Sequence, residues 1–251
     1  MCLIVFAWRP GHAQPLLLAA NRDEFHARPT QALGEWADTP GLYAGRDLQA
    51  GGTWLGVTAE GRFAALTNIR DPRLPQGERS RGELPLDFLR GTQTPEQYLR
   101  DVAGQAQHYS GFNLLVGTRE ALWFFNSKAG AVTRVQSGVH GVSNAGLDTP
   151  WPKLQRAKAA FAATLDDPQT PHLLALLADR QGAADADLPD TGIGLEWERL
   201  LSSIFICSPP YGTRASTVLR VLADGRQQLL ERSFGTQGEV IGEVELNLPP
   251  A

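Results

Sequence analysis

Residues 1–8 read MCLIVFAW, which places one of the two cysteines of the chain directly behind the initiator methionine and ahead of an apolar strand. Methionine aminopeptidases remove Met1 when residue 2 is small, so the mature chain is expected to begin with Cys2. The α-amine of Cys2, with a pKa near ~7.7–8.0, can then take the proton of its own thiol, and the thiolate is the nucleophilic form. Such a residue combines the nucleophile and the base that acyl transfer requires. The alternative is that Cys2 is a small apolar residue in a buried strand.

A second apolar run, at Pro15–Ala20, ends in the polar tetrad NRDE. The intervening RPGHAQ contains a Pro-Gly turn signal, so the two runs are predicted to form a hairpin that brings the tetrad to the edge of the sheet near Cys2. Within the tetrad, Asp23 can hold a protonated α-amine, and Arg22 can stabilise a thiolate or bind a substrate carboxylate. The alternative is a solvated turn with an Arg–Asp surface pair, which contributes little energy.

Further polar residues follow apolar runs or turns. Asn68 ends GRFAALTN, and Asn144 precedes AGLDTPW. An asparagine amide at a strand end can donate a hydrogen bond to an oxyanion, which is worth ~2.7–4 kcal/mol in a transition state. Asparagine is equally a common turn residue. Arg214, between a Pro-Pro-Tyr-Gly turn and an apolar stretch, can bind an acidic group or lie at the surface, and Cys207 inside IFICS is expected in the core.

The rest of the chain alternates between groups of strands and pairs of helices. Proline- and glycine-rich loops are expected before residue 51, at 69–82 and at 181–194. The order of elements fits sheets covered by helices in one α+β layered domain spanning residues 1–251. Helices are predicted at 83–90, 95–105, 150–165, 172–180 and 195–203, and the strands that follow the hairpin at 51–57, 61–68, 111–118, 121–127, 131–142, 204–208, 216–224 and 227–233.

Composition narrows the functional classes. Of 251 residues, 42% are apolar and 20% are charged, which is typical of a globular protein with a sizeable core. The net charge of −4, without a basic stripe, argues against a nucleic-acid partner. No apolar run approaches the ~20 residues that cross a bilayer, and no cationic leader precedes the apolar start, so the protein is expected in the cytoplasm. Scattered histidines and two cysteines without metal-ligand spacing predict neither a metal nor a cofactor.

Taken together, MCLIVFAW, AANRDEF, GGTWLGV, ALTNIRDP, RGELPLDFL, GFNLL and VSNAGLDTPWPK resemble the NRDE family, also called the transport and Golgi organization protein 2 family. The resemblance runs over nearly the whole chain in order, and its most specific motifs are the N-terminal Met-Cys and the NRDE tetrad. It implies an N-terminal-nucleophile (Ntn) hydrolase type of fold, an α+β, four-layer αββα sandwich of two antiparallel sheets. The best-known member is a eukaryotic protein associated with secretory-pathway organisation and haem trafficking.

A more distant likeness is to the choloylglycine hydrolases and penicillin acylases, cysteine Ntn enzymes that begin Met-Cys and carry G-R-N-x-D-W on the second strand. Asn21 and Asp23 match the N-x-D of that stretch. Ala20 stands where those enzymes have arginine, and Arg22 falls at the variable position. The likeness implies that Asp23 partners the α-amine and that Asn144 resembles the asparagine of the oxyanion hole.

The leading hypothesis is a cysteine Ntn hydrolase that cleaves a non-peptide amide C–N bond of a small molecule. Cys2 is the expected nucleophile, Asp23 the residue that orients the ammonium, and Asn144 the oxyanion donor together with a backbone N–H. The competing hypothesis is a non-catalytic carrier that binds an amphipathic ligand such as haem in the same cleft, and a third is a scaffolding role. The candidate substrate-binding residues are Asn21, Arg22, Asn68 and Arg214.

Overall fold

The computed structural model describes residues 2–250, which form two antiparallel β-sheets and a small number of helices. The strands are β1 (Cys2–Trp8), β2 (Leu16–Phe25), β3 (Thr30–Trp36), β4 (Thr39–Asp47), β5 (Leu55–Thr58), β6 (Phe63–Asn68), β7 (Phe112–Gly117), β8 (Leu122–Asn126), β9 (Ala131–Arg134), β10 (Gly138–Val142), β11 (Tyr211–Val221), β12 (Gln227–Phe234) and β13 (Val240–Leu248). The α-helices are α1 (Glu83–Arg90), α2 (Pro95–Gly104), α3 (Pro152–Ala163), α4 (Thr170–Leu177) and α5 (Leu195–Leu200).

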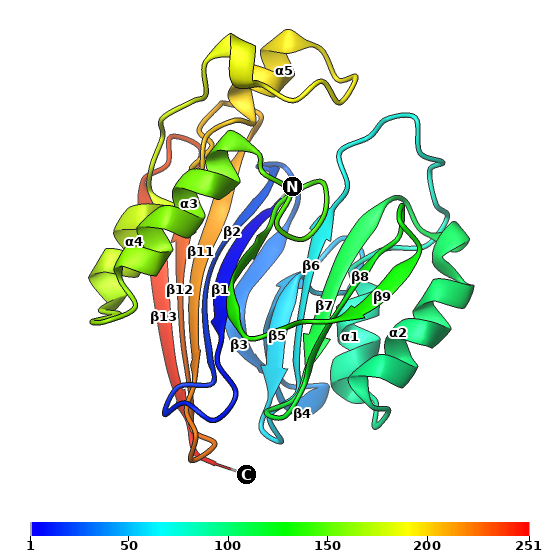
Figure 1. Cartoon of the computed structure of the whole chain (residues 1–251), viewed down its shortest axis with the longest axis vertical. Coiled ribbons are helices and arrows are strands. Elements are labelled where there is room, and N and C mark those ends of the chain that lie inside the picture. The colour runs from blue at the N-terminus through cyan, green and yellow to red at the C-terminus, as the bar shows by residue number, and fades with distance from the viewer. Residues whose placement is uncertain (1, 251) are drawn as a thin grey trace.

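The two sheets pack face to face between two layers of helices (Figure 1). One sheet has six strands in the order β10-β1-β2-β11-β12-β13, and the other has seven in the order β3-β4-β5-β6-β7-β8-β9. Helices α1 and α2 contact the seven-stranded sheet, whereas α3 and α4 contact the six-stranded sheet. The expected α+β sandwich of two antiparallel sheets between helical layers is therefore confirmed.

Strand β1 is apolar throughout because both of its faces are buried. Ile4 and Phe6 point into the core between the two sheets, whereas Leu3 and Val5 pack in the core beneath α3 and α4. Strands covered on both faces read as continuous apolar runs, since neither set of alternating side chains meets water. By the same alternation Cys2 shares the inward face of Ile4, so its thiol lies on the side of β1 that faces the other sheet.

Three sequence-based expectations about the elements are wrong. The predicted strand 131–142 is two strands, β9 and β10, because the chain passes from one sheet to the other through Gly138, whose φ is 148°. Residues 204–208 form only an isolated bridge to β11, and Cys207 is exposed rather than in the core. The loop expected before residue 51 contains β3 and β4. Its Gly45 serves packing and not a turn, since a side chain there would collide with the ring of Trp54.

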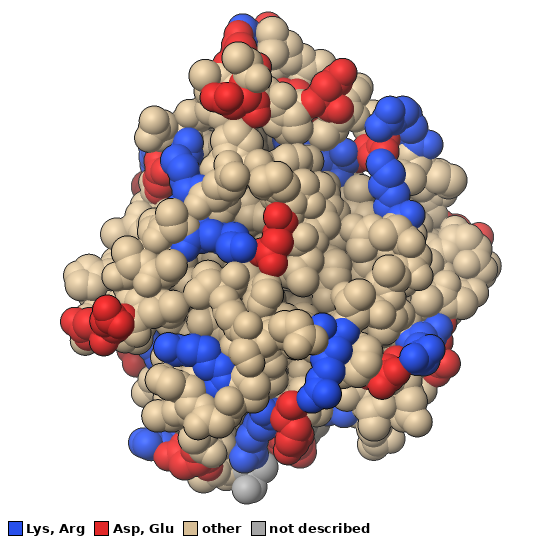
Figure 2. Space-filling view, in the orientation of Figure 1, with Lys and Arg blue, Asp and Glu red and all other residues tan. Residues whose placement is uncertain are grey.

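No helix within residues 2–250 is long and apolar enough to cross a bilayer. On the face of the molecule shown in Figure 2, basic and acidic side chains are interspersed and do not gather into a stripe. That face therefore presents no continuous row of cations of the kind that follows a nucleic-acid backbone.

A buried carboxylate joins the two sheets, and its removal is expected to destabilise the protein. Glu231 of β12 is 3% exposed, and its Oε1 accepts a 2.7 Å hydrogen bond from the backbone N–H of Leu33 in β3. Glu231→Ala leaves this N–H buried without its acceptor, so we expect the free energy of unfolding to fall by about 1–3 kcal/mol in urea denaturation. The control is Glu245→Ala, at an exposed position of β13, with an expected change below about 0.5 kcal/mol. Equal effects of the two variants would contradict the assignment.

Candidate active site

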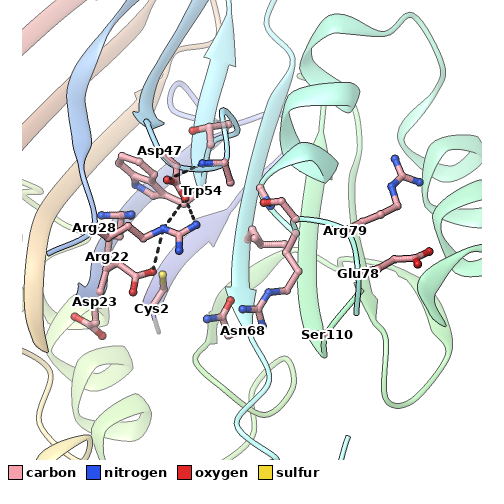
Figure 3. A pocket seen from close by; sticks show the side chains of 17 residues that line it. Cys2, Arg22, Asp23, Arg28, Asp47, Trp54, Asn68, Glu78, Arg79 and Ser110 are labelled. Atoms are coloured by element: carbon pink, nitrogen blue, oxygen red, sulfur yellow. Dashed lines mark hydrogen bonds and ion pairs between the residues drawn. The ribbon is translucent and has the colours of Figure 1, made fainter. Parts of the chain in front are cut away.

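A cleft of about 350 Å³ opens where β1 begins and where β2 and β6 end (Figure 3). Both sheets line it, together with residues 78–82 of the loop that precedes α1. Its volume is near the lower end of the ~300–1,000 Å³ typical of small-molecule sites. Of the residues that the sequence singled out, the cleft brings together Cys2, Arg22, Asp23 and Asn68.

Cys2 is the first residue of β1, and Arg22 is its partner across the ladder between β1 and β2. Its side chain is partly exposed to the cleft. Burial raises the pKa of the Cys2 thiol, and the Asp23 carboxylate acts in the same direction. The Arg22 guanidinium and a hydrogen bond from the backbone N–H of Asp23 lower that pKa. The thiol therefore needs a nearby base to become a nucleophile at neutral pH.

Asp23 points to the opposite face of β2 from Arg22, towards α3. It is 1% exposed, and its Oδ1 accepts a 2.7 Å hydrogen bond from the Thr213 hydroxyl. The Tyr211 hydroxyl donates to the backbone carbonyl of Asp23 at 2.9 Å. Burial raises the pKa of Asp23, and the largest opposing effect comes from Lys153. The carboxylate is thus held rigidly beside the start of β1.

Lys153 is a site residue that the sequence analysis missed. It lies in the first turn of α3 and is 2% exposed. Burial lowers its pKa to about 8, while attraction to Asp23 opposes that change. Lys153 thus provides a positive charge behind Asp23, on the helix side of the six-stranded sheet. The one available signal was a lysine inside an apolar, alanine-rich helix of a chain with few lysines.

Asn68 and Asn144 are adjacent, but only one of them lines the cleft. Asn144 is fully buried, and its Nδ2 donates to the backbone carbonyl of Asn68 at 2.9 Å. The carbonyl of Asn144 in turn accepts from the backbone N–H of Arg70 at 2.8 Å. The side chain of Asn68 lies in the cleft beside Cys2 (Figure 3). Asn144 therefore braces Asn68, and Asn68 is the one of the two whose side chain lines the cleft.

Two predicted substrate-binding residues, Asn21 and Arg214, make other contacts. The Nδ2 of Asn21 donates to the carbonyls of Leu177 and Ile204 at 2.8 and 2.9 Å, and the Ser216 hydroxyl donates to its Oδ1 at 2.6 Å. Arg214 donates through Nη1 to three backbone carbonyls of the turn after β2. Both residues lie outside the lining of this cleft. Their contacts are therefore structural ones outside the cleft, and their predicted role in substrate binding stays a prediction.

Besides the predicted Arg22, the cleft contains arginines that the sequence did not mark, among them Arg28 and Arg81. Arg22 itself stacks on the ring of Trp54, with 4.2 Å from its Cζ to the ring centroid. Arg28 pairs with Asp47 through Nη2 at 2.6 Å. Arg81 enters from the loop at 69–82 and donates to the carbonyl of Gly111 at 3.1 Å. Sequence patterns place Arg28 and Arg81 in loops, and only the folded chain brings them to the cleft.

The arrangement provides the components of acyl transfer: a thiol, a buried carboxylate near the chain start, an amide donor and guanidinium groups. No group of three or more His, Cys, Asp or Glu side chains within residues 2–250 is placed to hold a metal ion.

Comparison with known proteins identifies the family. Residues 1–236 match the family described as Transport and Golgi organisation 2. The chain belongs to the Transport and Golgi organisation 2 family. Relatives in this family include the Transport and Golgi organization protein 2 homologs of Bos taurus and Homo sapiens, which are 37% and 35% identical to this chain, with 93% of each sequence covered in both comparisons. The resemblance inferred from the motifs is therefore confirmed.

A solved structure supports the fold assignment. A mutant of the conjugated bile acid hydrolase from Clostridium perfringens matches with a TM-score of 0.54 at 9% sequence identity, over 99% of this chain and 92% of that one. The likeness shows that this member of the Transport and Golgi organisation 2 family shares its fold with an Ntn hydrolase.

Charges on either side of Cys2 are expected to move the pKa of its thiol in opposite directions. Arg22→Gln removes a cation that favours the thiolate, so the pKa should rise, whereas Asp23→Asn removes an anion that disfavours it, so the pKa should fall. The measurement is the pH dependence of Cys2 alkylation by iodoacetamide, read by peptide mass spectrometry. A change of one in pKa alters the rate below the pKa about tenfold. Exposed Cys207 is the internal reference, and shifts of the same sign in both variants would refute the assignment.

Proposed function

We propose that this protein is a cysteine Ntn hydrolase that cleaves a non-peptide amide C–N bond, with Cys2 as the nucleophile after removal of Met1. The observation that supports this proposal is the position of Cys2. It begins a central strand of the six-stranded sheet, its side chain reaches the cleft, and buried Asp23 lies beside it on the neighbouring strand. Met1 lies outside the described residues, so its removal is an expectation that experiment must establish.

In the proposed reaction the free α-amine of Cys2 takes the proton from the thiol, and the thiolate attacks the carbonyl carbon of the amide. The resulting ammonium is stabilised by Asp23, which the Thr213 hydroxyl holds in place. The ammonium then returns its proton to the departing nitrogen, and the C–N bond breaks to leave a thioester. Water hydrolyses the thioester, which releases the acid and restores the thiol.

The negative oxygen of the tetrahedral intermediate requires a donor fixed in advance. The side chain of Asn68 is suited to this role because it lies in the cleft beside Cys2 (Figure 3). Its backbone is braced by Asn144, so the donor is held in position before the substrate binds.

The carrier hypothesis assigns the same cleft to an amphipathic ligand such as haem. Such a ligand needs an extended apolar wall. The apolar side chains in the described lining are those of Ala50, Trp54 and Leu66. Eight of the described lining residues are charged. No histidine is among the described lining residues, which leaves Cys2 as the available haem ligand there. The composition of the cleft therefore favours a small polar substrate.

Removal of the nucleophile is the direct test of the proposed reaction. A panel of small amides is incubated with the purified protein, the released amine is measured by fluorescence derivatisation, and the intact mass reports whether Met1 is absent. We expect Cys2→Ala to retain the fold and to lower turnover by about 10⁴-fold or more. The matched control is Cys207→Ala, with turnover unchanged, because that thiol is exposed and lies outside the lining of the cleft. Wild-type turnover in Cys2→Ala would end the proposal.

Substitutions of Asn68 and Asn144 are expected to differ in their effects on kcat and on Tm. Asn68→Ala removes the donor and should lower kcat about 10²–10³-fold, with a small change in Tm. Asn144→Ala removes the brace from a fully buried position, so it should lower Tm more and kcat less. Thermal unfolding and steady-state kinetics of both variants provide the comparison. The reverse pattern would return the oxyanion role to Asn144.

A further inference from the structure

We propose that the substrate carries an anionic group, a carboxylate or its equivalent, that binds between Arg22 and Arg81 beside Cys2. The identification of this group as part of an amide substrate rests on the proposed function. The anion site itself rests on the charges of the cleft and is testable without turnover.

Two guanidinium groups of the cleft lack a carboxylate partner. Among residues 2–250, none of the ion pairs of 4.0 Å or shorter involves Arg22 or Arg81. Their hydrogen bonds go to neutral groups instead, at 3.2 Å to the Thr30 hydroxyl and at 3.1 Å to the carbonyl of Gly111. Arg22 is 6% exposed. Burying a cation without a counter-charge costs free energy, so an anion that binds beside these guanidinium groups would be stabilised.

The other cations that line the cleft are already paired. Arg28 lies 2.6 Å from Asp47 and 4.0 Å from Glu24. Arg79 lies 2.6 Å from Glu83. Glu24 also attracts Arg81 over a longer distance, while Arg28 repels it. The described lining holds four carboxylates and four guanidinium groups. Asp47 and Glu24 lie against Arg28, Glu78 lies 3.0 Å from His108, and Asp23 points to the opposite face of β2, so within the described part of the chain none of these carboxylates forms an ion pair with Arg22 or Arg81.

Both unpaired guanidinium groups are held in place before any ligand arrives. Arg22 is fixed between the face of Trp54 and the Thr30 hydroxyl. Arg81 is half-buried and tied to the backbone at Gly111. Donors fixed in this way lose little conformational entropy when an anion binds. A Cys2 thiolate interacts with both arginines but balances only one of the two charges.

The size of the cleft limits the ligand to a small molecule. Two kinds of amide combine a scissile C–N bond with a nearby anion. In an N-acyl amino acid the carboxylate is on the amine half, and in the monoamide of a dicarboxylic acid it is on the acyl half. Both present the same chemistry to Arg22 and Arg81, and the experiment separates them.

The first test compares an anionic and a neutral reagent at the same sulfur. Iodoacetate and iodoacetamide both alkylate the thiolate with loss of iodide, so any change in the pKa of Cys2 cancels in the ratio of their rates. We expect the iodoacetate to iodoacetamide ratio at Cys2 to exceed that at exposed Cys207 by about tenfold, and to fall as salt is added. A ratio at Cys2 equal to or below that at Cys207 would overturn the anion site.

Variants then assign the effect to residues. Arg22→Gln and Arg81→Gln should each reduce the ratio at Cys2 severalfold. Arg79→Gln is the matched control, since Arg79 lines the cleft but is paired with Glu83, and it should keep the ratio. Arg81→Lys keeps the positive charge, so it should retain part of the elevated ratio at Cys2. This variant replaces Arg81→Gln if the glutamine variant does not fold. A ratio that survives both glutamine substitutions would also overturn the assignment.

The substrate class is tested by protection of Cys2 from iodoacetamide. N-acetylglycine is compared with N-acetylglycinamide, and glutaramate with glutaramide, so that each acid has a neutral partner of the same shape. Stronger protection by one acid identifies the half that carries the anion. Equal protection by the acid and its neutral partner in both pairs, or no protection at all, overturns the substrate class.

Because labelling needs no hydrolysis, a protein with the expected ratios and no amidase activity would refute the proposed function and keep the anion site. Hydrolysis of amides without a preference for acids would support the proposed function and refute the anion site.

Discussion

The pairing of β1 with β2, in which Cys2 stands opposite Arg22, is the constraint on which the site depends. Side chains alternate along a strand, so a slip of one residue would exchange the two faces of the whole hairpin. Such a slip would place the thiol beneath the helices and Asp23 in the core between the sheets. Because β10 and β11 flank the hairpin and both its faces are buried, the apolar residues on each side fix the register. The positions of Cys2, Arg22 and Asp23 then follow without further adjustment.

The second sheet completes the site through buried polar contacts at one end of the sandwich. The Thr67 hydroxyl donates to the carbonyl of Ser143 at 2.5 Å, and Asn113 donates to that hydroxyl at 3.0 Å. Asn126 links Asn113 to the carbonyl of Ala145, at 2.7 and 2.8 Å. These contacts join β6, β7 and β8 to the segment after β10, where apolar packing gives way to hydrogen bonding. A satisfied polar network of this kind favours one specific arrangement, because each unpaired member would be strongly unfavourable. The hydrogen bond from Asn144 to the carbonyl of Asn68 joins the same two segments, so the asparagine of the cleft is held by the contact between the sheets.

The sequence predicted the parts of the site that depend on local order along the chain. The hairpin, its polar end and the candidate nucleophile follow from residues within one short segment, so Cys2 and Asp23 could be paired in advance. Arg81 reaches the cleft, and Lys153 reaches the far side of Asp23, from distant segments, and their local patterns are those of an ordinary loop and an ordinary helix. Asn68 ends β6 and Asn144 follows β10 by two residues, and only packing decides which amide faces the cleft. The edge strands β3 and β13, and β4 next to β3, escaped prediction because their exposed residues and glycines resemble loops, as Gly45 of β4 illustrates.

The charges of the site are divided by the six-stranded sheet in a way that suits the proposed proton transfer. On the inward face Arg22, together with Arg81 from the loop that precedes α1, attracts a thiolate at Cys2. On the outward face Asp23, with Lys153 behind it, lies where an ammonium at the chain start would be stabilised. Moving a proton from the thiol to the α-amine places each new charge next to its opposite. In a buried site these interactions are stronger than in water, and the groups that make them are already oriented. If the α-amine of Cys2 is free, the surrounding charges therefore favour the pair of thiolate and ammonium. A cysteine preceded by a peptide bond has no α-amine to take the proton, so it cannot form this pair.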